Sequence, residues 1–167
     1  GKSASEIVEA MKLVGSAKPE LLENVQALSD MTEAVLILSQ ASGMDLSNAT
    51  SNLAVIMNQF GMTAAQANEA INILAAGSKF GSVEVDYLAQ AISKVGTVAS
   101  SAGLSLEQVT AVMELFGEKG IQAEIAGTGF KNVLLKLQSD TKNYTNGVFD
   151  LNKAIDNNKS ISKDNLA

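Results

Sequence analysis

The chain has 167 residues, 46% of them apolar, and its 12 basic and 18 acidic side chains give a net charge of -6. Every basic residue is Lys, and Cys and His are absent, which excludes disulfides, Cys/His zinc sites and catalysis by Cys–His or Ser–His pairs. Without the planar fork of Arg, and with an acidic balance, nucleic-acid binding is not expected.

Apolar positions three and four residues apart recur through most of the chain, and no segment alternates with period two. This periodicity predicts an all-α fold. A short helix is expected over residues 5–14, ending at Gly15. Pro19 then begins a longer helix over residues 19–42, because Pro is favoured in the first turn and Glu20 complements the helix dipole there.

The most informative local pattern occurs three times, and it indicates a helix end followed at once by a helix start. A Gly is followed by Met or Leu and then by Asp, Thr or Ser, with Asn or Gln three residues further on. The Gly can close a helix in the left-handed conformation, and the polar residue can cap the next helix. Helices are therefore expected over residues 46–60, 64–78 and 106–118. The junction residues are Gly43 with Asp45, Gly61 with Thr63, and Gly103 with Ser105.

A looser joint follows at residues 77–82, where Ser82 would cap a helix over residues 83–102. Another Gly-containing break precedes a helix over residues 122–138. Gly127 is counted with the junction residues, since it marks either a close approach between helices or an irregularity of the backbone. Together these elements predict a helical bundle of about six to seven helices joined by short Gly-capped turns.

The chain is expected to divide into three parts. Residues 1–18 form a leading helix and linker, residues 19–139 form the core helical module, and residues 140–167 form a polar, flexible extension of a longer protein. The last part is rich in Asp, Asn, Lys and Ser, a composition that disfavours a packed core. No membrane span is expected, because the purely apolar run at residues 34–38 is far too short.

No group of side chains predicts a catalytic, cofactor or metal site. Glu114 and Glu118 stand one helical turn apart and Glu124 follows them, which could suggest a carboxylate pair. With Lys119 and Lys131 nearby, a solvated and ion-paired surface explains these acids better. The sequence therefore indicates a protein that is not an enzyme.

Several motifs, in this order, resemble the core of the phage tail tape measure family. A helix ending in Gly leads into Met-Asp-Leu at residues 43–46, and the next helix ends in Phe-Gly-Met at 60–62. A Lys-Val-Gly-Thr-Val-Ala stretch at 94–99 and a Gly-Thr-Gly-Phe stretch at 127–130 are also similar to family motifs. The resemblance covers about residues 5–137.

This resemblance implies a long, mostly helical virion protein that occupies the lumen of the tail tube and is made in the cytoplasm of the bacterial host. Such a protein determines tail length and organises assembly of the tail tube. Its implied partners are the tail tube protein, tail assembly chaperones and baseplate proteins, with membrane contact only during genome ejection. The repeated Gly-capped junctions favour a compact module over a continuous coiled coil, which would show unbroken heptads.

Two other roles stay open on the sequence alone. One is a helical protein-protein interaction domain of a bacterial secretion or surface assembly, and the other is a membrane-active segment used in genome delivery. Self-association is also compatible with the Ala-rich helix faces. Any enzymatic activity would have to reside elsewhere in a longer protein.

Overall fold

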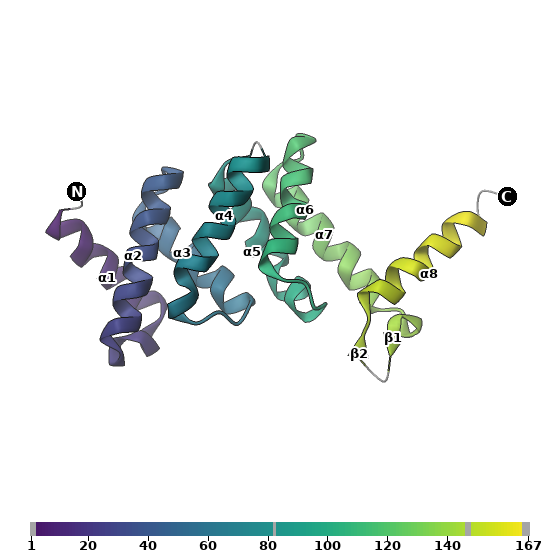
Figure 1. The fold of residues 1–167 in the computed structure, drawn as a ribbon, viewed down its shortest axis with the longest axis horizontal. Helices are drawn as coiled ribbons and strands as arrows, with labels where there is room; N and C mark the ends of the chain where they lie inside the picture. The colour runs from purple at the N-terminus through teal and green to yellow at the C-terminus, as the bar shows by residue number, and fades with distance from the viewer. Residues whose placement is uncertain (1–2, 82, 146–147, 165–167) are drawn as a thin grey trace.

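The computed structural model describes residues 3–81, 83–145 and 148–164. Eight α-helices account for most of this described part, and a two-stranded hairpin is its only sheet (Figure 1). The predicted all-α fold is therefore confirmed. The helices are α1 (Ala4–Ala17), α2 (Val25–Ser42), α3 (Leu46–Gln59), α4 (Ala67–Gly81), α5 (Val85–Ser101), α6 (Leu106–Glu118), α7 (Ala123–Gln138) and α8 (Leu151–Asp164).

The first seven helices are stacked in two layers along one axis. Consecutive helices pack together, and so do helices that are next but one, from α1 with α3 to α5 with α7. As a result, α2, α4 and α6 lie in one layer and α1, α3, α5 and α7 lie in the other (Figure 1). The two ends of the chain lie at opposite ends of this array (Figure 1). The contacts are thus mainly between near neighbours in the chain, as in stacked helical repeats.

The core between the two layers is built from small and aliphatic side chains. Because an Ala side chain extends so little from the backbone, helices that meet through Ala can approach closely. Larger side chains such as Leu53, Ile56 and Leu88, all fully buried, fill the remaining space. Alanines with no exposed surface include Ala10, Ala34, Ala49, Ala67, Ala70, Ala89, Ala91 and Ala99. Among the helices of the described residues, none combines the length and apolar content that a bilayer span requires.

The first helix ends later than the sequence suggested. It does not stop at Gly15 but continues to Ala17. Lys18 then leaves the helical region with φ -136° and ψ 76°, because the residue before a Pro is disfavoured in the helical conformation. The end of α1 is therefore set by Pro19 rather than by the glycine.

The helix expected over residues 19–42 is divided in two. Residues Pro19–Glu23 form a short 3-10 helix, and α2 begins only after Asn24. The side-chain oxygen of Asn24 accepts a hydrogen bond from the Ala27 N–H at 3.0 Å, so Asn24 acts as an N-cap that starts a new helix.

Beyond α7 the chain leaves the two-layer array. A hairpin pairs β1 (Tyr144–Thr145) with β2 (Val148–Phe149), and the Tyr144 and Phe149 rings meet edge to face at 5.6 Å between centroids. The helix α8 contacts the preceding turn, where Asn157 donates a hydrogen bond to the Asn143 side chain at 2.6 Å. The flexibility expected of this part stays a prediction.

Candidate functional site

At the three repeated junctions, a Gly in the left-handed conformation closes the helix. The backbone φ angle is 73° at Gly43, 66° at Gly61 and 81° at Gly103, a region in which an L side chain is strained. A fourth glycine of this kind, Gly120, follows α6 with φ 73°. Each glycine lets the chain reverse direction within a few residues, which places consecutive helices side by side.

The polar residues of these junctions act as helix caps. The Asp45 carboxylate accepts a hydrogen bond at 2.8 Å from a backbone N–H in the first turn of α3. Ser105 and Gln108 form a reciprocal capping box, with bonds of 3.3 and 3.0 Å, at the start of α6. The Thr63 N–H donates to the Gln66 side chain at 3.0 Å, at the turn that leads into α4. Each cap satisfies backbone donors that the first turn of a helix leaves unpaired.

The two remaining residues predicted as junction residues, Gly127 and Ser82, differ from the six above. Gly127 lies inside α7, not at a helix junction. A Cβ built on Gly127 would overlap the carbonyl oxygen of Ala91 and lie 2.9 Å from the Lys94 Cβ, both in α5. Gly127 therefore serves close packing of α5 and α7, the first of the two explanations that its sequence context allowed. Ser82 lies outside the described residues.

The structure brings two of the three repeated junctions together. Met62, Leu104 and Ser105 line one small cavity of about 200 Å³ where α4 and α6 begin. The third junction lies apart, since Gly43 borders a different cavity together with Asp86 of α5. The junction residues hold the array together and do not form a single site.

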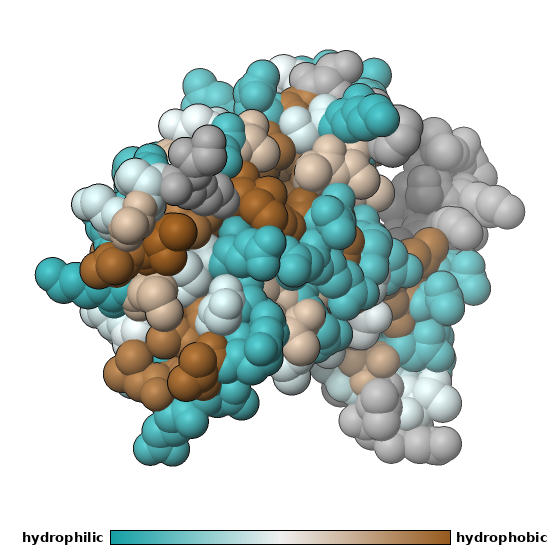
Figure 2. All heavy atoms as spheres, turned by 60° about the vertical axis from the view of Figure 1, so that its left-hand side comes forward, coloured by the Kyte–Doolittle hydropathy of each residue, from teal (hydrophilic) through white to brown (hydrophobic). Residues whose placement is uncertain are grey.

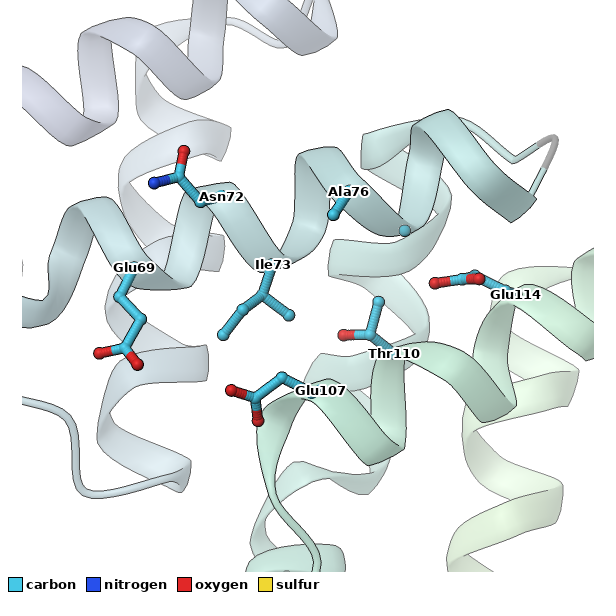
Figure 3. Close-up of a pocket in the computed structure, with 8 residues that line it drawn as sticks. Glu69, Asn72, Ile73, Ala76, Glu107, Thr110 and Glu114 are labelled. Carbon is cyan, nitrogen blue, oxygen red and sulfur yellow. The ribbon is translucent and has the colours of Figure 1, made fainter.

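A larger groove of about 610 Å³ runs between α4 and α6 and is called the α4–α6 groove below (Figure 3). Glu69 of α4 and Glu107 of α6 extend toward each other at one end, and Glu114 lies at the other end (Figure 3). The middle of the groove is apolar, with Ile73 and Ala76 on its α4 side (Figure 3). The lining residues are Glu69, Asn72, Ile73, Ala76 and Gly77 from α4, and Glu107, Thr110 and Glu114 from α6.

Thr110 contributes a buried hydroxyl without a hydrogen-bond partner. The residue is 2% exposed, and within the described part of the chain its Oγ1 makes no hydrogen bond. Its oxygen is turned toward the space between Ile73 and Glu107 (Figure 3). Leaving such a group unpaired costs about 1–3 kcal/mol, so an unsatisfied hydroxyl in a native structure requires an explanation.

The carboxylates of the groove differ in their electrostatic surroundings. Burial, and secondarily the nearby charge of Glu118, raise the pKa of Glu114. A hydrogen bond with Ser105, and then one with the backbone, lower the pKa of Glu107. Glu124, an acid that the sequence assigned to an ion-paired surface, pairs with Lys94 at 3.5 Å. In the described residues no group of three or more His, Cys, Asp or Glu side chains has the arrangement of a metal site. The carboxylates that line the groove give it a negative charge, which attracts cationic groups.

Apolar side chains are also exposed at the N-terminal end of the array. Val8 is 65% exposed, Leu22 60% and Val25 79%, and Figure 2 shows hydrophobic patches on the side of the molecule turned toward this end. At the other end, Ile125 and Val133 border an apolar cavity of about 210 Å³ between α6 and α7. Exposed apolar surface of this kind is typical of contacts with other proteins.

Sequence reasoning considered Glu114 but missed Glu69, Glu107 and Thr110 as members of one site. Glu107, Thr110 and Glu114 are spaced by three and four residues, so they share one face of α6. This polar stripe within an apolar helix was the available signal. No sequence signal indicated that Glu69 belongs to the groove, because its position opposite α6 depends on the order of helices within a layer.

The comparisons with known proteins find relatives among phage tail proteins. The chain matches the family model described as "Phage-related minor tail protein" over residues 1–163. It is 30% identical over 140 residues to the tape measure protein of Pneumococcus phage Dp-1, an alignment that covers 84% of this chain and 12% of that protein. It is 33% identical over 120 residues to the probable tape measure protein of Halomonas phage phiHAP-1, with 69% and 13% covered.

These relatives are much longer than the chain, which spans 12% of one and 13% of the other. No solved structure gives a significant match. The family match, by contrast, runs along nearly the whole sequence and includes every helix of the two-layer array. The chain therefore belongs to the phage-related minor tail protein family.

Proposed function

We propose that the chain is a folded module of a phage tail tape measure protein, a structural and assembly component of the virion. The observation that carries this proposal is the match of most of the chain to two proteins named as tape measure proteins, of which it covers only a small part. A module of this kind acts through surfaces that contact other proteins, and it has no catalytic step of its own.

The two-layer array supports a compact module rather than a fully extended ruler. A single helix rises about 1.5 Å per residue, so 120 residues in one straight helix would span about 180 Å. In the array the helices fold back on one another within a few residues. The segment therefore contributes much less length to a tail in its folded state than its residue count would allow.

The module would lie in the lumen of the tail tube after synthesis in the bacterial cytoplasm. Its proposed partners are the tail tube protein, tail assembly chaperones and baseplate proteins, and the exposed apolar surfaces at both ends of the array are candidates for these contacts. A membrane would be met only during genome ejection. The acidic balance of the chain disfavours binding to the packaged genome.

The test is an in-frame deletion of residues 19–138 from the parent gene of the phage, followed by electron microscopy of the tails. A folded module predicts tails shortened by clearly less than about 180 Å, or a defect in tail assembly. Shortening by the full helical length would mean that the segment is stretched as a ruler. Tails of normal length with normal infectivity would contradict a role in the tail.

A further inference from the structure

We propose that the α4–α6 groove is a docking site for an α-helix of a partner protein that presents two basic side chains two helical turns apart. Glu107 and Glu114 are seven residues apart on α6, which separates their backbones by about 10.5 Å along the helix axis. Glu69 adds a second carboxylate beside Glu107 (Figure 3). Two basic residues seven positions apart on another helix have the same spacing and face the same side.

The middle of the groove fits the rest of such a helix. Ile73 and Ala76 give an apolar surface between the two acidic ends. The aliphatic stems of Lys or Arg pack on apolar surface while their charged heads reach the carboxylates. A bare metal ion would leave this apolar middle unused.

The buried hydroxyl of Thr110 supports the proposal independently of the carboxylates. Its hydroxyl is buried, has no partner within the described residues, and faces the groove between the two acidic ends (Figure 3). Lys and Arg are pure donors. Because the Thr110 Oγ1 is almost closed to solvent in the free chain, a basic head reaches it, and supplies the hydrogen bond that the folded chain lacks, after a small shift of the surrounding side chains. The partner thereby accounts for a polar group that the fold alone leaves unsatisfied.

The charges of the groove favour the same class of partner. The chain carries a net charge of -6, and the groove brings carboxylates from two helices together. Burial of Glu114 near Glu118, which raises the pKa of Glu114, costs stability in the free protein and is relieved by a cation. Such an arrangement is more typical of a binding site than of a structural contact. This inference does not depend on the role of the module in tail length.

The experiment titrates the 167-residue chain with an Ala-rich helical peptide carrying two Lys seven positions apart. A control peptide of identical composition has its second Lys five residues after the first, about 140° away around the helix axis. Amide NMR shifts locate the binding surface. The proposal expects the seven-spaced peptide to shift the signals of Ala76 and Thr110 and to bind about fivefold or more tightly than the control at low ionic strength.

Variants then separate the groove from general charge attraction. Glu107→Gln and Glu114→Gln should each weaken binding about fivefold, whereas Glu9→Gln, the same charge change on α1, should leave binding unchanged. Thr110→Val should also weaken binding although it does not weaken the fold. Opposite effects on binding and stability would not arise from a merely structural Thr.

Several outcomes would overturn the proposal. Equal binding of both peptides, or an equal loss with Glu9→Gln, would mean that only net charge attracts them. Absence of amide NMR shifts at the residues of the groove would also contradict the proposal. Spermidine binding as tightly as the peptide, with the same shifts, would assign the groove to a small polyamine instead of a partner helix.

Discussion

The α5–α7 and α4–α6 contacts have the same place in the architecture, since each joins next-but-one helices within a layer, but they are built differently. At Gly127 a Cβ would meet the backbone carbonyl of Ala91. At Gly77 a Cβ would meet side chains instead, 2.5 Å from the Thr110 Cγ2 and 2.7 Å from the Glu114 Oε1. One contact is backbone against backbone, and the other is backbone against movable side chains.

The α5–α7 contact is therefore rigid, whereas the α4–α6 contact is adjustable. A carbonyl oxygen held in a helix cannot move without displacing the helix, whereas the Glu114 side chain is only half-buried and can turn away. The rigid contact also includes the Cβ of Lys94. The α4–α6 contact carries carboxylates and a hydroxyl without a hydrogen bond along an open groove, which is where the proposed partner helix would bind.

The largest expected effect comes from Gly127→Ala. Its Cβ would push α7 away from α5, and overpacking of this kind costs about 3 kcal/mol of the free energy of unfolding. The matched control is Gly129→Ala in the same helix, where a Cβ meets nothing within 4 Å. That variant should gain about 0.5–1 kcal/mol from helix propensity. Urea denaturation measures both, and equal stability of the two variants would refute the rigid contact.

Thr110→Val should have an effect of intermediate size and opposite sign. Val has nearly the shape of Thr but lacks the hydroxyl, so the variant removes a buried group without a partner. The free energy of unfolding should rise by about 1 kcal/mol. Thr50→Val is the comparison, because the Thr50 hydroxyl donates to the Leu46 carbonyl at 2.6 Å. A larger gain at Thr50 than at Thr110 would contradict this account.

The smallest expected effect is that of Glu114→Gln, and it depends on pH. The folded-state pKa of Glu114 is raised by burial and by Glu118, so protonation favours the folded state and its benefit is lost as pH rises through that pKa. At pH 7 the neutral Gln should therefore raise Tm by about 1 °C, a small effect because solvent screens the half-buried group. Near pH 4 the gain should shrink, and a gain independent of pH would rule out this electrostatic origin.

The junctions could be predicted because their physics is local. A Gly in the left-handed conformation and a capping residue that bonds three residues further on both depend on one short stretch of chain. Gly61 and Thr63 are an example. Two helix boundaries were predicted wrongly because two local signals competed. Gly15 and Pro19 both suggest an end for the first helix, and Pro19 and Asn24 both suggest a start for the second. There the Pro decided the end of α1, and the Asn cap decided where α2 begins.

The groove could not be predicted in the same way. Glu69 and Glu107 are 38 positions apart in the sequence, and they meet only because α4 and α6 are neighbours in one layer. Helical periodicity shows which face of a helix is apolar but not which helix covers it. The role of Gly127 stayed undecided for the same reason, because its contact is with α5 rather than with its own turn.

The separation of the two termini at opposite ends of the array has a mechanical consequence (Figure 1). Because each helix contacts mainly its neighbours, tension applied to the termini loads the outermost helices first, and the inner ones keep their contacts until those have detached. An extended chain spans up to about 3.3–3.6 Å per residue, so each detached helix lengthens the molecule considerably. Tension on its ends would therefore lengthen the array in successive steps rather than all at once.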